Sequence, residues 1–315
     1  MRRLGGWMPR PRRVALRLVQ LARMALVALA TLLVLTPRAA AYCQMTTVAG
    51  GSTPGICVTD GIPLRWERRC ISYSLEAHGS ADLEIGLLSE TVRASFATWL
   101  DVRCGGSPTD FEIAETEAFS SCAEAQYRSD GGNVNTIAFV DDWAARGYDE
   151  SVLVTTTVWH NTRTGVIYDV DMEINQAAGP FGVCPPEGCG GCPTIAGTQT
   201  DLQNVMTHEI GHFFGIGHSG VATSTMWFQS CRGETSRRSL EGDDIAALCS
   251  IYPPGSLPAE CSFTPRGGLA LSCGDDGGLC AISRGSGGGA PWGALLLTLL
   301  ILGGRRSRRS RRRVD

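Results

Sequence analysis

The chain contains no lysine, so all 28 of its basic residues are arginines. This absence points to coding bias more than to chemistry, and the distribution of the arginines is more informative. Residues 1–41 hold eight arginines and no acidic residue, and residues 305–313 hold seven. The stretch 42–280 has 12 arginines against 30 acidic residues, a formal charge of −18. Phosphate binding needs a basic face, so this composition argues against nucleic acid as a partner.

The chain also lacks an apolar run of the roughly 20 residues that a membrane-spanning helix needs. Its two apolar runs cover only residues 24–35 and 292–302. Arginines precede the first run, and the small residues RAAA follow it, as in an export signal. We therefore predict that residues 1–41 are a signal peptide, with an N-terminal anchor as the alternative. The mature protein is then exported, to the cell envelope, the cell surface or the medium.

Thirteen cysteines in an exported chain predict disulfides rather than free thiols. Six pairs leave one cysteine over, and the pairing cannot be read from the sequence. Cys184, Cys189 and Cys192 could instead suggest a zinc site. No fourth cysteine or histidine lies near them, so bridges are the preferred interpretation.

Hydrophobic periodicity predicts a mixed α+β domain of three main helices and several strands. The expected helices cover residues 81–102, 200–214 and 240–252, and Thr200 with Gln203 fits a capping box at the start of the second. The expected strands cover residues 70–76, 111–116, 135–140, 151–159 and 166–175.

The composition changes at Pro253, where proline, glycine and serine become frequent. This change marks the end of the only folded domain that we expect. The predicted organisation is a signal peptide (1–41), a short N-terminal segment (42–65), a catalytic domain (66–254), a linker rich in Gly, Pro, Ser and Cys (255–289) and a tail that is apolar and then arginine-rich (290–315).

Three of the five histidines lie within eleven residues, in HEIGHFFGIGH (208–218). On a helix, His208 and His212 project from the same face one turn apart, so both can reach one metal ion. Gly215 can end the helix in a left-handed conformation and let the chain return His218 as a third ligand. Three nitrogen ligands with an open fourth position describe catalytic zinc, and Glu209 is placed to take a proton from metal-bound water. A merely histidine-rich surface helix needs neither the glutamate nor the glycine.

These residues resemble the zinc signature HExxHxxGxxH of the metzincin metalloproteases, and Met226 in TSTMW resembles their methionine turn. Gly211, Ser219 and the short gap to Met226 resemble the matrixin branch. CISYSL, GVIYDVDMEIN and DDIAALCSIYP resemble other parts of the matrixin core, as found in bacterial members. The resemblance covers roughly residues 65–253. It implies a twisted mixed five-stranded sheet with three main helices.

The resemblance further implies a monomeric zinc endopeptidase acting on protein or peptide substrates without a covalent intermediate. His208, His212 and His218 would bind the metal, Glu209 would act as general base and then general acid, and Met226 would form an apolar floor beneath the site. Two alternatives stay open. One is a surface binding or adhesion module on a metzincin scaffold, and the other is a zinc amidase that acts on cell-wall peptide.

Some residues depart from the family pattern. Animal matrixins carry a second, structural zinc bound largely by histidines, but only His78 and His160 remain here, and we expect both to be surface or packing residues. Calcium is a second possible cofactor, because Asp169, Asp171 and Glu173 could supply the oxygen ligands that it prefers. The alternative is that these three side chains, which share one strand face, are simply solvated.

Two cysteines lie in segments that resemble functional motifs of other proteins. Cys104 in VRCGGSPTD resembles the cysteine switch of matrixin propeptides, but it follows the first core helix, so we expect a disulfide partner instead. The C-terminal spacer, apolar run and arginine cluster resemble the sorting tail of myxobacterial surface proteins. By that resemblance Cys280 would be processed and lipidated, and the membrane would be contacted only through this tail. A plain tail anchor is the alternative.

Overall fold

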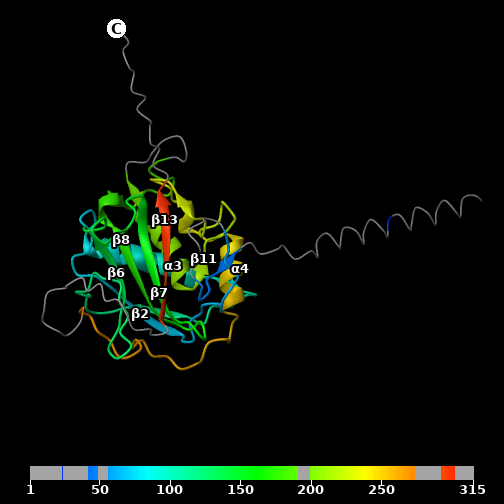
Figure 1. Ribbon diagram of the computed structural model, residues 1–315. Helices are drawn as coiled ribbons and strands as arrows, with labels where there is room; N and C mark the ends of the chain where they lie inside the picture. The colour runs from blue at the N-terminus through cyan, green and yellow to red at the C-terminus, as the bar shows by residue number, and fades with distance from the viewer. Residues whose placement is uncertain (1–22, 24–41, 49–55, 191–198, 274–291, 302–315) are drawn as a thin grey trace, which may run out of the picture. The chain divides into compact units, whose positions relative to one another are not determined.

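Five strands form the core sheet of the computed structural model, which describes residues 23, 42–48, 56–190, 199–273 and 292–301 (Figure 1). Their order is β7-β8-β6-β2-β5. The pairs β2/β5, β2/β6 and β6/β8 are parallel, whereas β7 is antiparallel to β8. The predicted mixed five-stranded sheet is therefore confirmed. The five strands are β2 (Cys70–Leu75), β5 (Glu112–Glu115), β6 (Asn135–Val140), β7 (Val152–Asn161) and β8 (Ile167–Asn175).

Two further strands extend this sheet beyond β7. The apolar run near the C-terminus forms β13 (Trp292–Ile301), which pairs antiparallel with β7, and β12 (Gln229–Ser230) pairs parallel with β13. The sequence pattern did not predict this role for the run. Among the described residues, no helix is long and apolar enough to cross a membrane.

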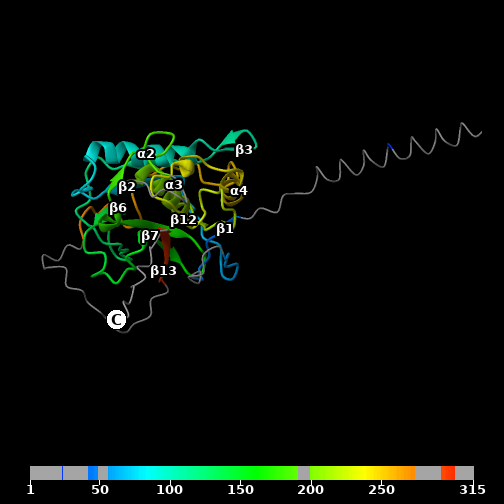
Figure 2. The ribbon, with the colours of Figure 1, turned by 90° about the horizontal axis from the view of Figure 1, so that it is seen from above.

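The three predicted helices are present, and they lie on one side of the sheet (Figure 2). They are α2 (Ile85–Leu100), α3 (Leu202–Phe213) and α4 (Gly242–Ile251). The expected capping box at Thr200 and Gln203 is wrong, because the Asp201 carboxylate accepts the hydrogen bond from the Asn204 N–H at 2.8 Å. Thr200 lies instead in a short strand. The capping box is found on α4, between Glu241 and Asp244.

Aromatic side chains fix α3 between the sheet and α2. The Trp99 indole, fully buried, donates to the Thr207 carbonyl at 2.8 Å, and the Trp66 indole donates to the Phe213 carbonyl at the same distance. Phe96 packs edge-on against Phe213. Burying one such side chain contributes about 2 kcal/mol, so α3 is held rigidly along its length.

The remaining elements are short and connect these layers. They are β1 (Cys43–Gln44), β3 (Arg103–Cys104), β4 (Ser107–Pro108), η1 (Gln176–Ala178), β9 (Phe181–Gly182), β10 (Thr200–Asp201), β11 (Ile216–Gly217) and η2 (Ser236–Arg238).

Disulfides cross-link the domain, which confirms the prediction made from the cysteine count. Cys104 bonds to Cys249 in α4, so its interpretation as a disulfide partner is correct. Cys184 bonds to Cys189, and this bond removes both from any zinc site. Cys192 and Cys280 lie outside the described residues. The other bridges are Cys43–Cys57, Cys70–Cys261 and Cys122–Cys273, and Cys231 is also disulfide-bonded.

Candidate metal and catalytic site

Three histidines converge at the end of α3. His208 and His212 lie one turn apart on the helix, and Gly215, with φ of +79°, ends it in the left-handed conformation predicted from the sequence. The chain continues through β11 and returns His218 to the same place. One ring nitrogen from each histidine lies within 4.8 Å of the other two. The spacing in the sequence therefore produces a three-nitrogen cluster.

Backbone carbonyls set the tautomers of the two helical histidines. Nδ1 of His208 donates to the Thr225 carbonyl at 2.6 Å, and Nδ1 of His212 donates to the Ile216 carbonyl at 2.7 Å. A carbonyl can only accept, so the proton stays on Nδ1 and each Nε2 keeps a free lone pair. The Nε2 atoms of His208, His212 and His218 are buried and have no hydrogen-bond partner.

Burial also keeps these rings neutral. It lowers the pKa of His212 to about 4 and that of His208 and His218 well below the usual value, with neighbouring histidines adding to the effect on the latter two. Metal ligation requires neutral imidazole. Three buried, unpartnered and neutral nitrogens that converge are the donor set that zinc takes, so the residues fit a zinc ion.

A residue of the core sheet fixes the side chain of Glu209. Its Oε2 accepts a hydrogen bond from Oγ1 of Thr156 in β7 at 2.6 Å, whereas its Oε1 is buried without a partner. Burial raises the pKa of Glu209 to about 8, and the bond from Thr156 opposes this shift. No local pattern pointed to Thr156, because this residue lies 53 positions from Glu209 in an ordinary strand pattern.

Met226 packs directly beneath the histidine helix. It is 1% exposed, and a Cβ on Gly211 would come within 2.1 Å of its sulfur and 2.9 Å of the Trp99 ring. Only glycine at position 211 therefore allows Met226 to lie against α3. This is the position expected of an apolar floor.

The loop that carries Met226 is tied to α4 by Asp244, a residue that sequence reasoning missed. Its carboxylate accepts from the backbone N–H groups of Thr225 at 2.9 Å and Met226 at 3.1 Å, and from the hydroxyl of Ser224. Since the Thr225 carbonyl accepts the hydrogen bond from His208, Asp244 indirectly fixes the position of this histidine.

The three acidic residues considered for calcium are buried on the other face of the sheet and are not solvated, so that alternative is wrong. Asp171 accepts from the Trp159 indole and two backbone N–H groups at 3.0 Å, and Glu173 pairs with Arg146 and accepts from Tyr148. Asp169 is completely buried, and neither of its oxygens has a partner. Two of the three expected ligands are therefore satisfied by the chain itself.

The other two histidines stand apart from the cluster. His78 is exposed and pairs with Glu76 at 2.7 Å, and His160 is buried with its Nδ1 2.9 Å from the Val158 carbonyl. These are the surface and packing roles that we expected. In the described part of the chain one other set of potential ligands converges, Cys70, Glu112 and Cys261, but its cysteines form a disulfide.

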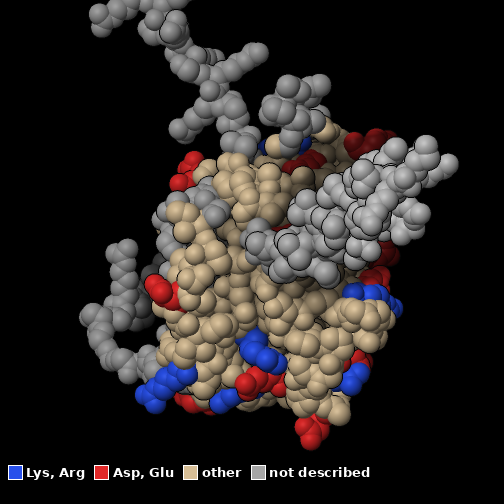
Figure 3. Space-filling model, turned by 90° about the vertical axis from the view of Figure 1, so that its right-hand side faces the viewer, with Lys and Arg blue, Asp and Glu red and all other residues tan. Residues whose placement is uncertain are grey.

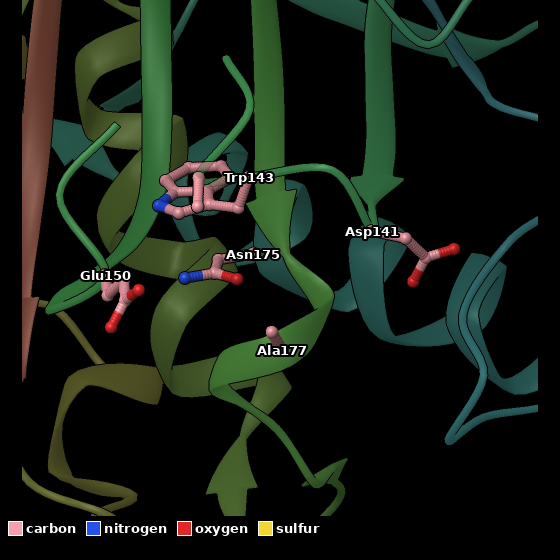
Figure 4. A pocket seen from close by; sticks show the side chains of 6 residues that line it. Asp141, Trp143, Glu150, Asn175 and Ala177 are labelled. Atoms are coloured by element: carbon pink, nitrogen blue, oxygen red, sulfur yellow. The ribbon is translucent and has the colours of Figure 1, made fainter. Parts of the chain in front are cut away.

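A separate cavity of about 260 Å³ lies beside the loop between β6 and β7, lined by Asp141, Trp143, Ala144, Glu150, Asn175 and Ala177 (Figure 4). None of these residues belongs to the histidine cluster. On the face seen in Figure 3, charged side chains of both signs are scattered and form no basic patch among the described residues. Neither feature competes with the histidine cluster as a reactive site.

The comparison with protein families shows to which family this fold belongs. The model of the matrixin family matches residues 65–253. The chain belongs to the matrixin family. This matrixin is 43% identical over 54 residues to metalloendoproteinase 1-MMP and 40% identical over 55 residues to metalloendoproteinase 5-MMP, both from Arabidopsis thaliana. The matched stretches cover 17% and 18% of this chain, and 15% of each relative.

Proposed function

We propose that this matrixin is a zinc-dependent endopeptidase. The observation that carries the proposal is the convergence of three buried, unpartnered Nε2 atoms next to a glutamate with one unpartnered carboxylate oxygen. Such groups are costly to bury, so they persist where a function requires them. The family match and the metalloendoproteinase names of the relatives support the same activity.

His208, His212 and His218 would hold the zinc ion. When bound, zinc lowers the pKa of a water molecule and polarises the carbonyl of the peptide bond. The chain's own residues supply the rest. With zinc bound, the charge of the metal opposes the effect of burial on the pKa of Glu209, so that the ionised carboxylate accepts a proton at Oε1 and returns it to the leaving amine. Thr156 holds Oε2, so that the carboxylate presents Oε1 in one orientation.

We also propose that the protein acts outside the cytoplasm. The export signal expected in residues 1–41 supports this location, and so does the set of disulfides, because such bonds persist in oxidising compartments. Attachment through the C-terminal tail and Cys280 rests on the sequence resemblance alone.

The direct test compares the oxidatively folded full chain without residues 1–41, the same protein with a zinc chelator, and Glu209→Gln. The substrate is casein, and zinc content is measured alongside. We expect one zinc per chain and slow but measurable cleavage in the first sample only. Glu209→Gln should keep its zinc and lose at least about a hundred-fold in rate, because general-base catalysis contributes that much. Cleavage by the chelated sample would refute the zinc mechanism.

A further inference from the structure

β7 is the edge strand of the core sheet that lies nearest to the catalytic carboxylate. Thr156, in its middle, donates the hydrogen bond to Glu209. Edge strands offer a row of unpaired N–H and C=O groups to any extended chain. An extended peptide that pairs with β7 at Thr156 therefore passes next to Glu209.

In this structure the chain's own β13 fills that position. β13 pairs antiparallel with β7, and Leu296 and Leu297 lie opposite Thr157 and Thr156 (Figures 1 and 2). The strand is therefore centred on the residue that holds the catalytic glutamate.

β13 also pairs with a short strand that follows Met226. Its end pairs with β12, where Leu300 and Ile301 lie opposite Gln229 and Ser230. β12 begins three residues after Met226. The strand thus lies between β7 on one side and the segment that follows the methionine on the other.

The burial of the site agrees with this closure. His208, Glu209 and His212 are all 0% exposed, whereas His218 is partly exposed. An endopeptidase has to bring an extended substrate into contact with its general base, and a carboxylate without exposed area admits none. A substrate therefore reaches Glu209 only after a local movement, while His218 keeps a partly exposed side of the cluster.

We infer that Trp292–Ile301 is an autoinhibitory strand that occupies the peptide-binding edge of β7 and keeps the enzyme latent. This inference rests on the proposed function. Peptide substrates bind only when the strand leaves, so the measured kcat/KM is scaled by the fraction of molecules in which β7 is open.

The tether explains why the strand can hold this place. The Cys122–Cys273 disulfide anchors the chain, and residues 274–291 join that anchor to β13. A short tether gives an effective concentration on the order of millimolar, which is lost when the tether is cut. Cys280, the expected processing position, lies inside this segment. Processing there would separate the strand from the enzyme and activate it.

The test introduces proline into the ladder, since proline has no N–H to donate. The variant Leu296→Pro with Leu297→Pro is compared with Leu296→Val with Leu297→Val, which keeps an apolar strand-forming pair. Both are made in the full chain without residues 1–41. We expect the proline variant to show at least about a ten-fold higher kcat/KM on a short fluorogenic peptide. The valine variant should stay within about two-fold of the parent.

Amide hydrogen exchange of residues 152–161 gives a readout that does not depend on activity. We expect faster exchange in the proline variant only. Unchanged exchange would show that β13 does not cover β7, and faster exchange without a rise in zinc-dependent cleavage would show that covering β7 does not inhibit. Either result overturns the inference. If every variant binds zinc but none cleaves any peptide, both the proposed function and the autoinhibition fail, while exchange still reports whether the strand covers β7.

Discussion

Ionisable side chains are buried on both faces of the core sheet, but the two sets differ in their hydrogen-bond partners. On the helix side, three histidines and Glu209 leave one atom each without a partner, and the histidine nitrogens converge. On the other side, Asp171 and Glu173 are satisfied by indole, backbone, arginine and tyrosine donors. Buried groups with converging free lone pairs indicate a metal site, whereas buried groups saturated by the chain indicate structure.

We expect the largest effect from a substitution in the histidine cluster on the helix side of the sheet. His212→Ala removes one of the three proposed zinc ligands and should weaken zinc binding by at least about a hundred-fold and abolish cleavage. His160→Ala is the matched control, because His160 is equally buried but stands outside the cluster. Zinc titration and cleavage assays measure the two predicted losses in both variants. Equal zinc affinity in the two variants would contradict the assignment of the ligands.

We expect a smaller effect from a substitution that disturbs the position of Glu209 but not the binding of zinc or substrate. Thr156→Val removes the hydroxyl that holds Glu209 and should lower kcat about ten-fold, the value of one hydrogen bond to a charged group. KM and zinc content should stay unchanged. Thr157→Val is the control, since alternation along β7 turns Thr157 to the opposite face. A similar loss in both variants would mean that Thr156 acts only through the stability of the strand.

We expect the smallest effect on the other face of the sheet. There Asp169 differs from Asp171 and Glu173, because its carboxylate oxygens have no hydrogen-bond partner. Burial and then the Asp171 carboxylate raise the pKa of Asp169 well above its usual value. The folded state therefore holds a proton that the unfolded state has lost, so stability should fall as the pH rises from about 4 towards the raised pKa.

Asp169→Asn removes this proton and should flatten that fall, with a gain of about 1 kcal/mol at pH 8. Thermal unfolding between pH 5 and pH 8 measures the effect, with the exposed Asp130→Asn as control. A steeper pH dependence in Asp169→Asn than in the parent would mean that Asp169 is charged in the folded protein and is stabilised by a cation.

Much of the fold and of the histidine cluster could be predicted from local patterns in the sequence. The strand 135–140 was predicted at its observed bounds, and the histidine spacing placed His208 and His212 on one helix face. Boundaries shifted where a distant partner intervened. Helix α2 starts at Ile85 rather than near residue 81, because Asp82 is engaged by Gln176 and by the Phe181 N–H.

The sequence by itself determined the features that depend on neighbours along the chain. These are the periodicity of helices and strands, the turn at Gly215 and the presence of disulfides. Tertiary structure alone decided which distant groups meet, namely Thr156 with Glu209, Asp244 with the Met226 loop, Arg146 with Glu173, and the apolar C-terminal run with β7. The physical reason is that helical and strand periods act over a few residues. A hydrogen bond between residues 53 positions apart exists only after the sheet and helices have packed.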